Sequence, residues 1–436
     1  MRAASLASAI FRPAGLVALL VGVGALGAVG LAAPRPLAPI RLQQLIDTAP
    51  AGSVLDLPPG WYVGPVRIDR PLTLRGGEGV ILDGRGEGTV LTVAADDVVV
   101  TGLTIRRSGD RADGVDAAVR VLGARARIED DTIADCLYGI DVRAAAAVVV
   151  RRNRISPREG PEQLRGDAIR VWYASGGLYE GNEIVGARDG FFLEATGNRL
   201  IGNTVRDGRY GAMLLYSRGI EIADNQFLDG AVGIMLIWSD EVEIARNRVR
   251  AGRDVAGQAL VLKESSGARI RDNDFFASAQ GVYLDASPKE PETENVFSGN
   301  RFAFDGVAVT FHSGLAGDRF EANLFTGNHT DLVVRGGGTA LASVWRDNVW
   351  DAFEGFDRDH DGVGDTPHEI WSWADRLWMD VPDAQLFRGA PALATLDFVE
   401  RLAPFSQPRL LMRDATPRLS AAATALPPSP NRDRPR

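Results

Sequence analysis

The chain has 436 residues, a formal net charge of −9 and a single cysteine, Cys136. An acidic protein is a poor match for nucleic acid, which requires a basic footprint, and for polyuronates captured by bulk charge. One cysteine excludes an intrachain disulfide, and we expect Cys136 to be a small buried hydrophobe.

Residues 1–33 have the features of an export signal. Arg2 and Arg12 form a basic start, and residues 15–33 are uninterruptedly apolar. Small residues near Gly30 and Ala32 suit a cleavage site, although a run of this length could also remain as a membrane anchor. Both alternatives place the body of the protein outside the cytoplasm, and we expect a periplasmic location.

After the signal, residues 42–46 predict a short amphipathic helix that caps the first coil of a repeat structure. The apolar phrases at residues 54–57, 72–74 and 80–83 then begin the coils.

A short phrase recurs along residues 128–350, with an apolar residue three positions before an asparagine and another two positions after it. The asparagines are Asn153, Asn182, Asn203, Asn225, Asn247, Asn273, Asn300, Asn323 and Asn348, and Asp131 occupies the same position one coil earlier. A period in the low twenties indicates stacked structural repeats, and the 3.6-residue periodicity of helical repeats is missing. The sequence therefore predicts an all-β fold, a right-handed parallel β-helix over residues 40–350.

We interpret the asparagines as part of the scaffold. Asparagine tolerates the left-handed backbone conformation that a sharp turn needs, and stacked asparagines form stabilising ladders of amides.

A second phrase in each coil alternates with period 2, as a β-strand does. Two columns are apolar throughout and should face the interior: Ile169, Phe191, Ala212, Ile234, Leu260, Val282 and Val307, then Val171, Leu193, Leu214, Leu236, Leu262, Leu284 and Val309. The two intervening columns should face outward: Arg170, Phe192, Met213, Met235, Val261, Tyr283 and Ala308, then Trp172, Glu194, Leu215, Ile237, Lys263, Asp285 and Thr310.

The outward columns contain an apolar strip where water is expected. It consists of Trp172, Phe192, Met213, Leu215, Met235, Ile237 and Tyr283. Large exposed apolar patches mark interaction surfaces, so we predict a partner-binding face. The alternative, which stays open, is that a terminal segment or a long loop covers the strip.

Residues 351–370 contain an acidic loop typical of Ca²⁺ sites. Asp357, Asp359, Asp361 and Asp365 stand at positions 1, 3, 5 and 9 with glycine at position 6, and the carbonyl of Val363 supplies a further oxygen. His368 replaces the glutamate of an EF-hand at position 12, so the loop is a shorter variant. We expect a structural Ca²⁺ ion that closes the end of the solenoid; the alternative is a solvated acidic turn.

Soft Cu(I) prefers thioether and thiolate donors. Met213 and Met235 occupy one outward column in adjacent coils and form a weak copper candidate; contact with a partner or covering loop is the alternative interpretation.

Parallel solenoids also occur among carbohydrate-active enzymes. Asp167, Asp189, Glu194, Glu264 and Asp285 lie around the strand phrases, and paired carboxylates can act in glycoside chemistry. They form no compact signature, so we expect no enzyme. A uronate-polymer lyase, epimerase or binder remains the alternative function.

Beyond the acidic loop, residues 371–413 have imperfect helical spacing and should cap the last coil, with or without presenting a docking surface. Residues 414–436 are rich in Ala, Pro, Ser and Arg without an apolar period and should be disordered.

The order of these phrases resembles that of the NosD family. The resemblance covers roughly residues 40–413, and rests on the strand phrases at residues 166–172, 189–194, 210–217, 233–239 and 259–264. The acidic loop preceded by Asn348-Val-Trp350-Asp351 and followed by residues 374–378, 386–390 and 396–405 is its more specific part.

The resemblance implies a periplasmic adaptor that works with the permease and the ATPase of an ABC transporter and contacts the membrane through the permease. It also implies a copper-delivering lipoprotein chaperone as a partner and nitrous oxide reductase as the client, whose copper–sulfide centre must be assembled. Because the chain has few soft donors, we expect copper to be held only transiently.

Overall fold

The computed structural model describes residues 41–252, 257–312, 316–372 and 408–419, together with the isolated residues Pro391, Thr395, Phe398 and Val399. The predicted export signal and most of the predicted capping segment at 371–413 lie outside these residues.

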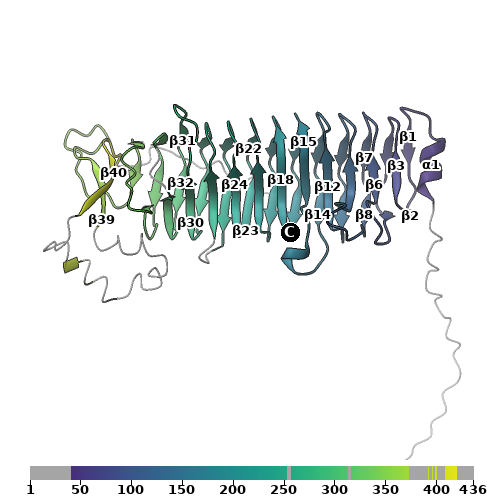
Figure 1. Ribbon diagram of the computed structural model, residues 1–436, viewed down its shortest axis with the longest axis horizontal. Coiled ribbons are helices and arrows are strands. Elements are labelled where there is room, and N and C mark those ends of the chain that lie inside the picture. Colours follow the sequence, from purple (N-terminus) through teal and green to yellow (C-terminus); the bar gives the residue numbers. More distant parts are fainter. Residues whose placement is uncertain are drawn as a thin grey trace, which may run out of the picture. The chain divides into compact units, whose positions relative to one another are not determined.

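The described chain is a parallel β-solenoid in which successive strands join three sheets in turn (Figure 1). Every third strand returns to the same sheet, which gives two 13-stranded sheets and one 12-stranded sheet. All pairings in these sheets are parallel, as the sequence predicted. Strands of two to eight residues alternate with tight turns, so the core is a stack of thin layers.

The first sheet contains β1 (Val54–Asp56), β4 (Thr73–Arg75), β7 (Val99–Thr101), β10 (Arg127–Glu129), β13 (Val149–Arg151), β16 (Leu178–Glu180), β19 (Arg199–Ile201), β22 (Glu221–Ala223), β25 (Glu243–Ala245), β28 (Arg269–Arg271), β31 (Asn295–Ser298), β34 (Asp318–Glu321) and β37 (Val344–Arg346). The second sheet contains β2 (Gly60–Val63), β5 (Val80–Asp83), β8 (Thr104–Arg106), β11 (Thr132–Ala134), β14 (Arg154–Ser156), β17 (Glu183–Val185), β20 (Thr204–Arg206), β23 (Gln226–Gly230), β26 (Arg248–Ala251), β29 (Asp274–Phe276), β32 (Arg301–Ala303), β35 (Leu324–Thr326) and β38 (Val349–Trp350). The third sheet contains β3 (Val66–Ile68), β6 (Leu91–Val93), β9 (Ala117–Val121), β12 (Tyr138–Arg143), β15 (Ile169–Ser175), β18 (Asp189–Thr196), β21 (Tyr210–Leu215), β24 (Val232–Ile237), β27 (Gln258–Lys263), β30 (Gln280–Asp285), β33 (Val307–Phe311) and β36 (Leu332–Val334).

The helix α1 (Leu42–Thr48) closes the N-terminal end of the solenoid (Figure 1). Leu42 and Ile46 stand four residues apart, so they share one face of the helix, and both are fully buried in the core that begins with the first coil. This position confirms the predicted cap, which covers apolar surface that a first coil would otherwise expose.

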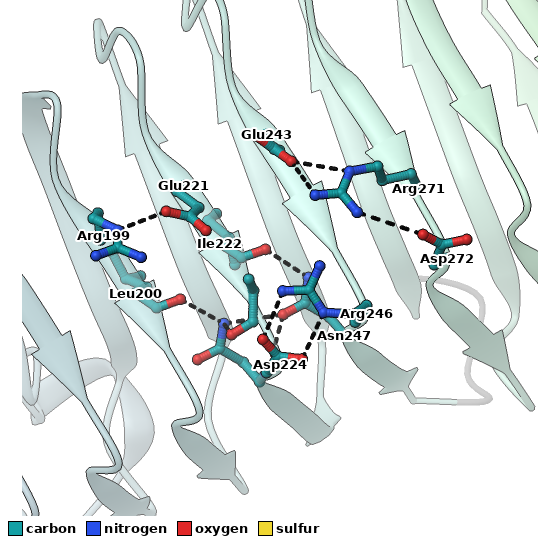
Figure 2. Close-up of polar contacts among 12 residues, drawn as sticks. Arg199, Leu200, Glu221, Ile222, Asp224, Glu243, Arg246, Asn247, Arg271 and Asp272 are labelled. Carbon is teal, nitrogen blue, oxygen red and sulfur yellow. Dashed lines mark hydrogen bonds and ion pairs between the residues drawn. The ribbon is translucent and has the colours of Figure 1, made fainter. Parts of the chain in front are cut away.

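The asparagines form a continuous buried ladder between the first and second sheets. The side-chain amide of Asn153 donates to the side-chain oxygen of Asn182 at 3.0 Å, and the same bond repeats coil by coil until Asn323 donates to Asn348 at 2.9 Å. Each amide also donates to a backbone carbonyl of the preceding coil, as Asn247 does to Ile222 (Figure 2). The scaffold interpretation is therefore confirmed.

We expected the asparagine to be the left-handed residue of this turn. In the structure, the left-handed residue is the one before it. Arg152, Asp224 and Arg246 have φ angles of 54°, 59° and 54°, and Gly181 and Gly202 occupy the same position with φ of 61° and 65°. None of the ladder asparagines has a positive φ angle.

The inward columns of the third sheet are buried as predicted, but the register of β33 was wrong by two residues. Val309, not Val307, pairs with Val282, and Phe311 pairs with Leu284. Val309 and Phe311 lie in the core, whereas Val307 is only partly buried. The outward positions of this coil are consequently Thr310 and, directly after the strand, His312.

Arginines tie neighbouring coils together on the outer surface. Figure 2 shows Arg246 bonded to Asp224 through two nitrogens at 2.8 and 2.7 Å, and Arg199 bonded to Glu221 at 2.6 Å. A guanidinium matches a carboxylate in this fork-like geometry and an ammonium does not. This accounts for a chain in which only Lys263 and Lys289 are lysines.

The last coil is closed by an antiparallel pair of strands, β39 (His368–Ser372) and β40 (Arg409–Asp414). The fully buried Asp414 ends the asparagine ladder, because its carboxylate accepts from the Asn348 amide at 2.9 Å and from the Trp350 indole at 3.1 Å. The boundary of the tail at residue 414 was therefore drawn too early.

At the other end of the ladder, Asp131 takes the position of an asparagine. One of its carboxyl oxygens accepts from the Leu103 backbone at 2.7 Å, but the other is buried without a partner. In the following coils this second position is an amide that donates to a backbone carbonyl. Burial raises the pKa of Asp131 to about 8, because a charged carboxylate there would be desolvated.

We predict that Asp131→Asn stabilises the protein at neutral and alkaline pH. The pKa of the folded-state carboxyl lies above the unfolded value, so its stabilising contribution is complete below about pH 4 and is lost as the pH rises towards 8. Asparagine does not titrate and restores the missing donor. The melting temperature should therefore rise at pH 8, for a gain on the order of 1–3 kcal/mol in unfolding free energy, with little change at pH 4. Equal effects at both pH values would contradict a protonation-dependent cost at Asp131.

Candidate partner-binding face and cation-binding loop

The predicted apolar strip lies on the outer surface of the third sheet. Trp172 belongs to β15, Phe192 to β18, Met213 and Leu215 to β21, Met235 and Ile237 to β24, and Tyr283 to β30. All seven side chains are half-buried.

Register holds the centre of the strip together. Phe192 pairs with Met213, Met213 with Met235, and Leu215 with Ile237 on adjacent strands. Adjacent strands lie about 4.8 Å apart, so these side chains are direct neighbours. The Trp172 and Phe192 rings stack with centroids 6.2 Å apart.

Tyr283 lies apart from the rest of the strip. Val261 stands between Met235 and Tyr283 in the register and is buried. The Tyr283 ring instead neighbours His312, with ring centroids 5.9 Å apart, and the guanidinium of Arg335 lies 5.7 Å from it. The apolar strip proper therefore runs from β15 to β24.

Three aromatic residues that the sequence analysis did not single out extend this face. Tyr173, Tyr216 and Trp238 each follow an outward residue of the strip and have left-handed φ angles of 46–50°. Tyr173 and Tyr216 are 65% and 58% exposed, and the rings of Tyr216 and Trp238 stack at 4.9 Å. The sequence signal that could have identified them is an aromatic residue directly after the second outward column.

The carboxylates considered for catalysis are engaged with partners in the structure. Asp167 lies 2.7 Å from Arg188, and Asp189 lies 2.6 Å from Arg209.

Two further carboxylates considered for catalysis, Glu264 and Asp285, also have partners. Glu264 accepts from the Trp238 indole at 2.7 Å, and Asp285 lies 3.8 Å from Lys263. The arrangement provides ion pairs between coils and does not isolate two carboxyls around an open space.

The acidic loop brings three of its predicted ligands together. One ligand atom from each of Asp357, Asp359 and Asp361 lies within 4.8 Å of the others. The Asp361 backbone lowers the pKa of Asp359, but the Asp361 and Asp357 carboxylates outweigh it and raise this pKa above its usual value. A cation would relieve this crowding of negative charge.

The other two predicted ligands belong to the same tight turn. The backbone of Val363 donates to Asp361 at 2.8 Å, and Asp365 accepts from the Arg358 backbone at 3.0 Å. Gly362 has a φ of 84°, which favours glycine at this position.

The loop is joined to the end of the chain. The Gly364 backbone N–H donates to the Pro417 carbonyl at 2.7 Å. The Arg418 backbone forms isolated β-bridges with both Val363 and Val349. Residues 416–419 therefore lie between the acidic loop and the last coil.

The donors for a soft metal are few among the described residues. Met213 and Met235 are register partners on the outer face, whereas Cys136 and Met412 are buried in the core. Two thioethers leave the shell of a Cu(I) ion incomplete.

Among solved structures, the chain is similar to the A-modules of two Azotobacter vinelandii mannuronan C-5 epimerases. The AlgE6 module has a TM-score of 0.54 and 17% identity, covering 69% of this chain and 93% of that module. The AlgE4 module has a TM-score of 0.55 and 14% identity, covering 69% and 95%. At this identity the likeness concerns the fold alone.

A family model described as "Periplasmic copper-binding protein (NosD)" matches residues 151–355. A "Probable ABC transporter binding protein NosD" of Stutzerimonas stutzeri is 27% identical over 402 residues, 80% of this chain and 83% of that protein. A protein of the same description from Pseudomonas aeruginosa is 27% identical over 421 residues, 82% of this chain and 88% of that protein. The chain is thus similar to the NosD proteins over about four fifths of its length.

Proposed function

We propose that this protein is a periplasmic, non-enzymatic adaptor of an ABC transporter that takes part in assembling the copper–sulfide centre of nitrous oxide reductase. The description of the matching family as periplasmic and copper-binding, and the naming of two relatives as ABC transporter binding proteins, support this proposal.

The observation that carries the proposal is the apolar strip on the third sheet. Met, Trp, Tyr and Phe are the residue types enriched in protein interfaces, and anchors of this kind supply most of the binding energy. A polar outer surface would suffice to keep a solenoid soluble, so the strip has a role beyond the scaffold.

The partners follow from the same role. The permease and its ATPase form the transporter, a lipoprotein chaperone delivers copper, and nitrous oxide reductase receives it. No helix among the described residues is long and apolar enough to span a membrane. In this proposal the membrane is contacted through the permease.

The carbohydrate-active alternative has less support. The carboxylates near the outer face pair with Arg188, Arg209 and Lys263, which leaves them poorly suited to exchange protons with a sugar. We therefore assign no reaction to this face.

We predict that Leu215→Arg combined with Ile237→Arg prevents recovery of the transporter. Tagged protein is purified from gently solubilised membranes of the host under denitrifying growth, and accompanying proteins are identified by mass spectrometry. Wild type should bring down a permease and ATPase pair. The variant should recover at least about tenfold less of this pair, because two half-buried apolar residues of the strip become charges.

The matched control is Val185→Arg combined with Val344→Arg, which places the same charges at exposed apolar positions of the second and first sheets. The control should retain the transporter. Wild-type protein that is recovered alone, even after crosslinking, would overturn the adaptor role.

We further propose that Met213 and Met235 hold Cu(I) transiently, with the partner supplying the remaining ligands. The two residues are adjacent in the middle of the strip, so a docked partner would cover the ion and complete its shell. Copper is then cargo that passes through the interface.

We predict weak Cu(I) binding by the isolated protein that disappears in Met213→Ala combined with Met235→Ala. Competition against a chromophoric Cu(I) chelator measures it, and Met412→Leu, which changes a buried methionine of β40, is the control. Identical competition by wild type and the double variant would exclude this pair as the copper site.

We also propose that Asp357, Asp359, Asp361, Asp365 and the carbonyl of Val363 bind a structural Ca²⁺. Three carboxylates already converge there, and hard cations prefer six to eight oxygen ligands. Water would complete the shell. The ion would fasten the loop against residues 416–419 and so close the end of the solenoid.

We predict that a Ca²⁺ chelator lowers the melting temperature by several degrees, since a ligand that binds only the folded state stabilises it. Asp359→Ala should melt at the lower temperature and show no response to chelator. Asp110→Ala removes an exposed carboxylate from a different loop and should respond as wild type does. A wild-type melting curve that chelator leaves unchanged would refute the site.

A further inference from the structure

Three arginines surround one carboxylate at the N-terminal end of the strip. We call Arg120, Arg143 and Arg170 the arginine cluster. The Arg120 and Arg143 Nε atoms lie 3.0 and 2.6 Å from one oxygen of Asp141, and an Arg170 nitrogen lies 3.7 Å from the other. Asp141 is fully buried, so the group presents a net charge of +2 at its surface.

This excess is larger than that of two comparable groups, in which two arginines contact Asp83 and three contact Glu129, one of them shared with Asp130. The chain as a whole carries a net charge of −9, and pairs such as Arg246–Asp224 and Arg199–Glu221 balance one arginine with one carboxylate. A local positive excess on an acidic protein concentrates field at one place.

Two other carboxylates near this face are engaged elsewhere. Asp167, which interacts electrostatically with Arg170, pairs with Arg188 at 2.7 Å. Glu194 pairs in register with Trp172, and its hydrogen bond with Tyr173 is the main reason that the pKa of this tyrosine is raised.

The cluster is continuous with the strip. The Arg170 guanidinium lies 4.3 Å from the centre of the Trp172 ring and 5.8 Å from that of Phe192. The arginine side chains are partly exposed, with Arg143 the most accessible at 35% and Arg120 and Arg170 at 21% and 17%. Any body that covers Trp172 and Phe192 therefore brings its own edge over these cations.

We propose that the arginine cluster binds a carboxylate of the partner protein that docks on the strip, and thereby sets the orientation of docking. The proposal rests on the adaptor function and adds the chemistry of the partner: an apolar patch with an acidic group at the edge that meets β12 and β15. Arginine favours this role because its fork of donors recognises a carboxylate bidentately.

A protein is the better occupant than an anionic membrane. Membrane-surface binding requires apolar groups that reach several ångströms into the lipid. The strip side chains are half-buried, so much of each already lies against the protein and only a part could enter a bilayer.

Arg143→Gln tests the proposal. Arg120 and Arg170 remain beside Asp141 in this variant, so the core stays compensated, and thermal melting checks the fold. The detergent-solubilised permease–ATPase complex is titrated between 50 and 500 mM NaCl. At low salt the variant should bind about fivefold to tenfold more weakly than wild type, and the two should converge at high salt as screening removes the attraction.

Two controls isolate the charge at this place. Arg143→Lys keeps the charge and should retain most of the affinity. Arg199→Gln removes an exposed arginine from the first sheet and should behave as wild type. Equal affinity and salt dependence of Arg143→Gln and wild type would overturn the cluster while leaving the adaptor function intact. Failure of wild type to bind at any salt concentration would remove both.

Two further measurements distinguish other occupants. Sedimentation with vesicles of 70% phosphatidylcholine and 30% phosphatidylglycerol should leave the protein in solution; wild type that sediments, when Arg143→Gln does not, would replace the partner carboxylate by lipid phosphate. A photoreactive phenylalanine at Tyr173, which is 65% exposed, should crosslink to the permease complex. Crosslinks confined to this chain itself would show that its own segment covers the face and would overturn the proposal.

Discussion

A buried asparagine amide at the turn between the first and second sheets must find hydrogen-bond partners, because an unpaired polar group in a dry interior costs about 1–3 kcal/mol. Asn225 illustrates how the solenoid meets this demand. Its side-chain nitrogen donates to Asn247 in the next coil and to Leu200 in the preceding one, while its oxygen accepts from Asn203. Shifting one coil by a single residue would strand all of these groups. The ladder thus fixes the register of every strand that it connects.

Fixed register has a consequence for the third sheet. Its inward columns are set by packing, but its outward columns are free to vary, since the ladder and the core already determine the position of each strand. The chain places Trp172, Phe192 and the methionine pair on that surface, and half-buried side chains held by their neighbours lose less conformational entropy on docking. The ladder and the core therefore hold the strands in place, and the outward side chains of the third sheet can serve binding.

Much of this fold was predictable because its determinants are local and repeated. The asparagine column and the alternating apolar columns each recur many times, so they identified the solenoid and the inward residues. The amphipathic pattern of residues 42–46 identified the cap helix. The register of β33 was missed because residues 307–311 contain apolar side chains at both alternatives, and only pairing with Val282 decides between them. The position of Asp414 was missed for a different reason: its partners, Asn348 and Trp350, lie more than sixty residues away. The strip itself was visible from alternation, whereas the arginine cluster needed the stacking of three coils around Asp141.

The two ends of the ladder show why carboxyls occur where the asparagine pattern stops. At Asp414 the group only has to accept: its carboxylate receives donors from Asn348, Trp350 and the Thr416 backbone. At Asp131 the same side chain must both accept and donate, and it can donate only while it is protonated. Aspartate therefore suits the hydrogen-bond partners at the C-terminal end of the ladder but not those at the N-terminal end. The direction of the amide chain, with each side chain donating to the next coil, makes the two positions unequal.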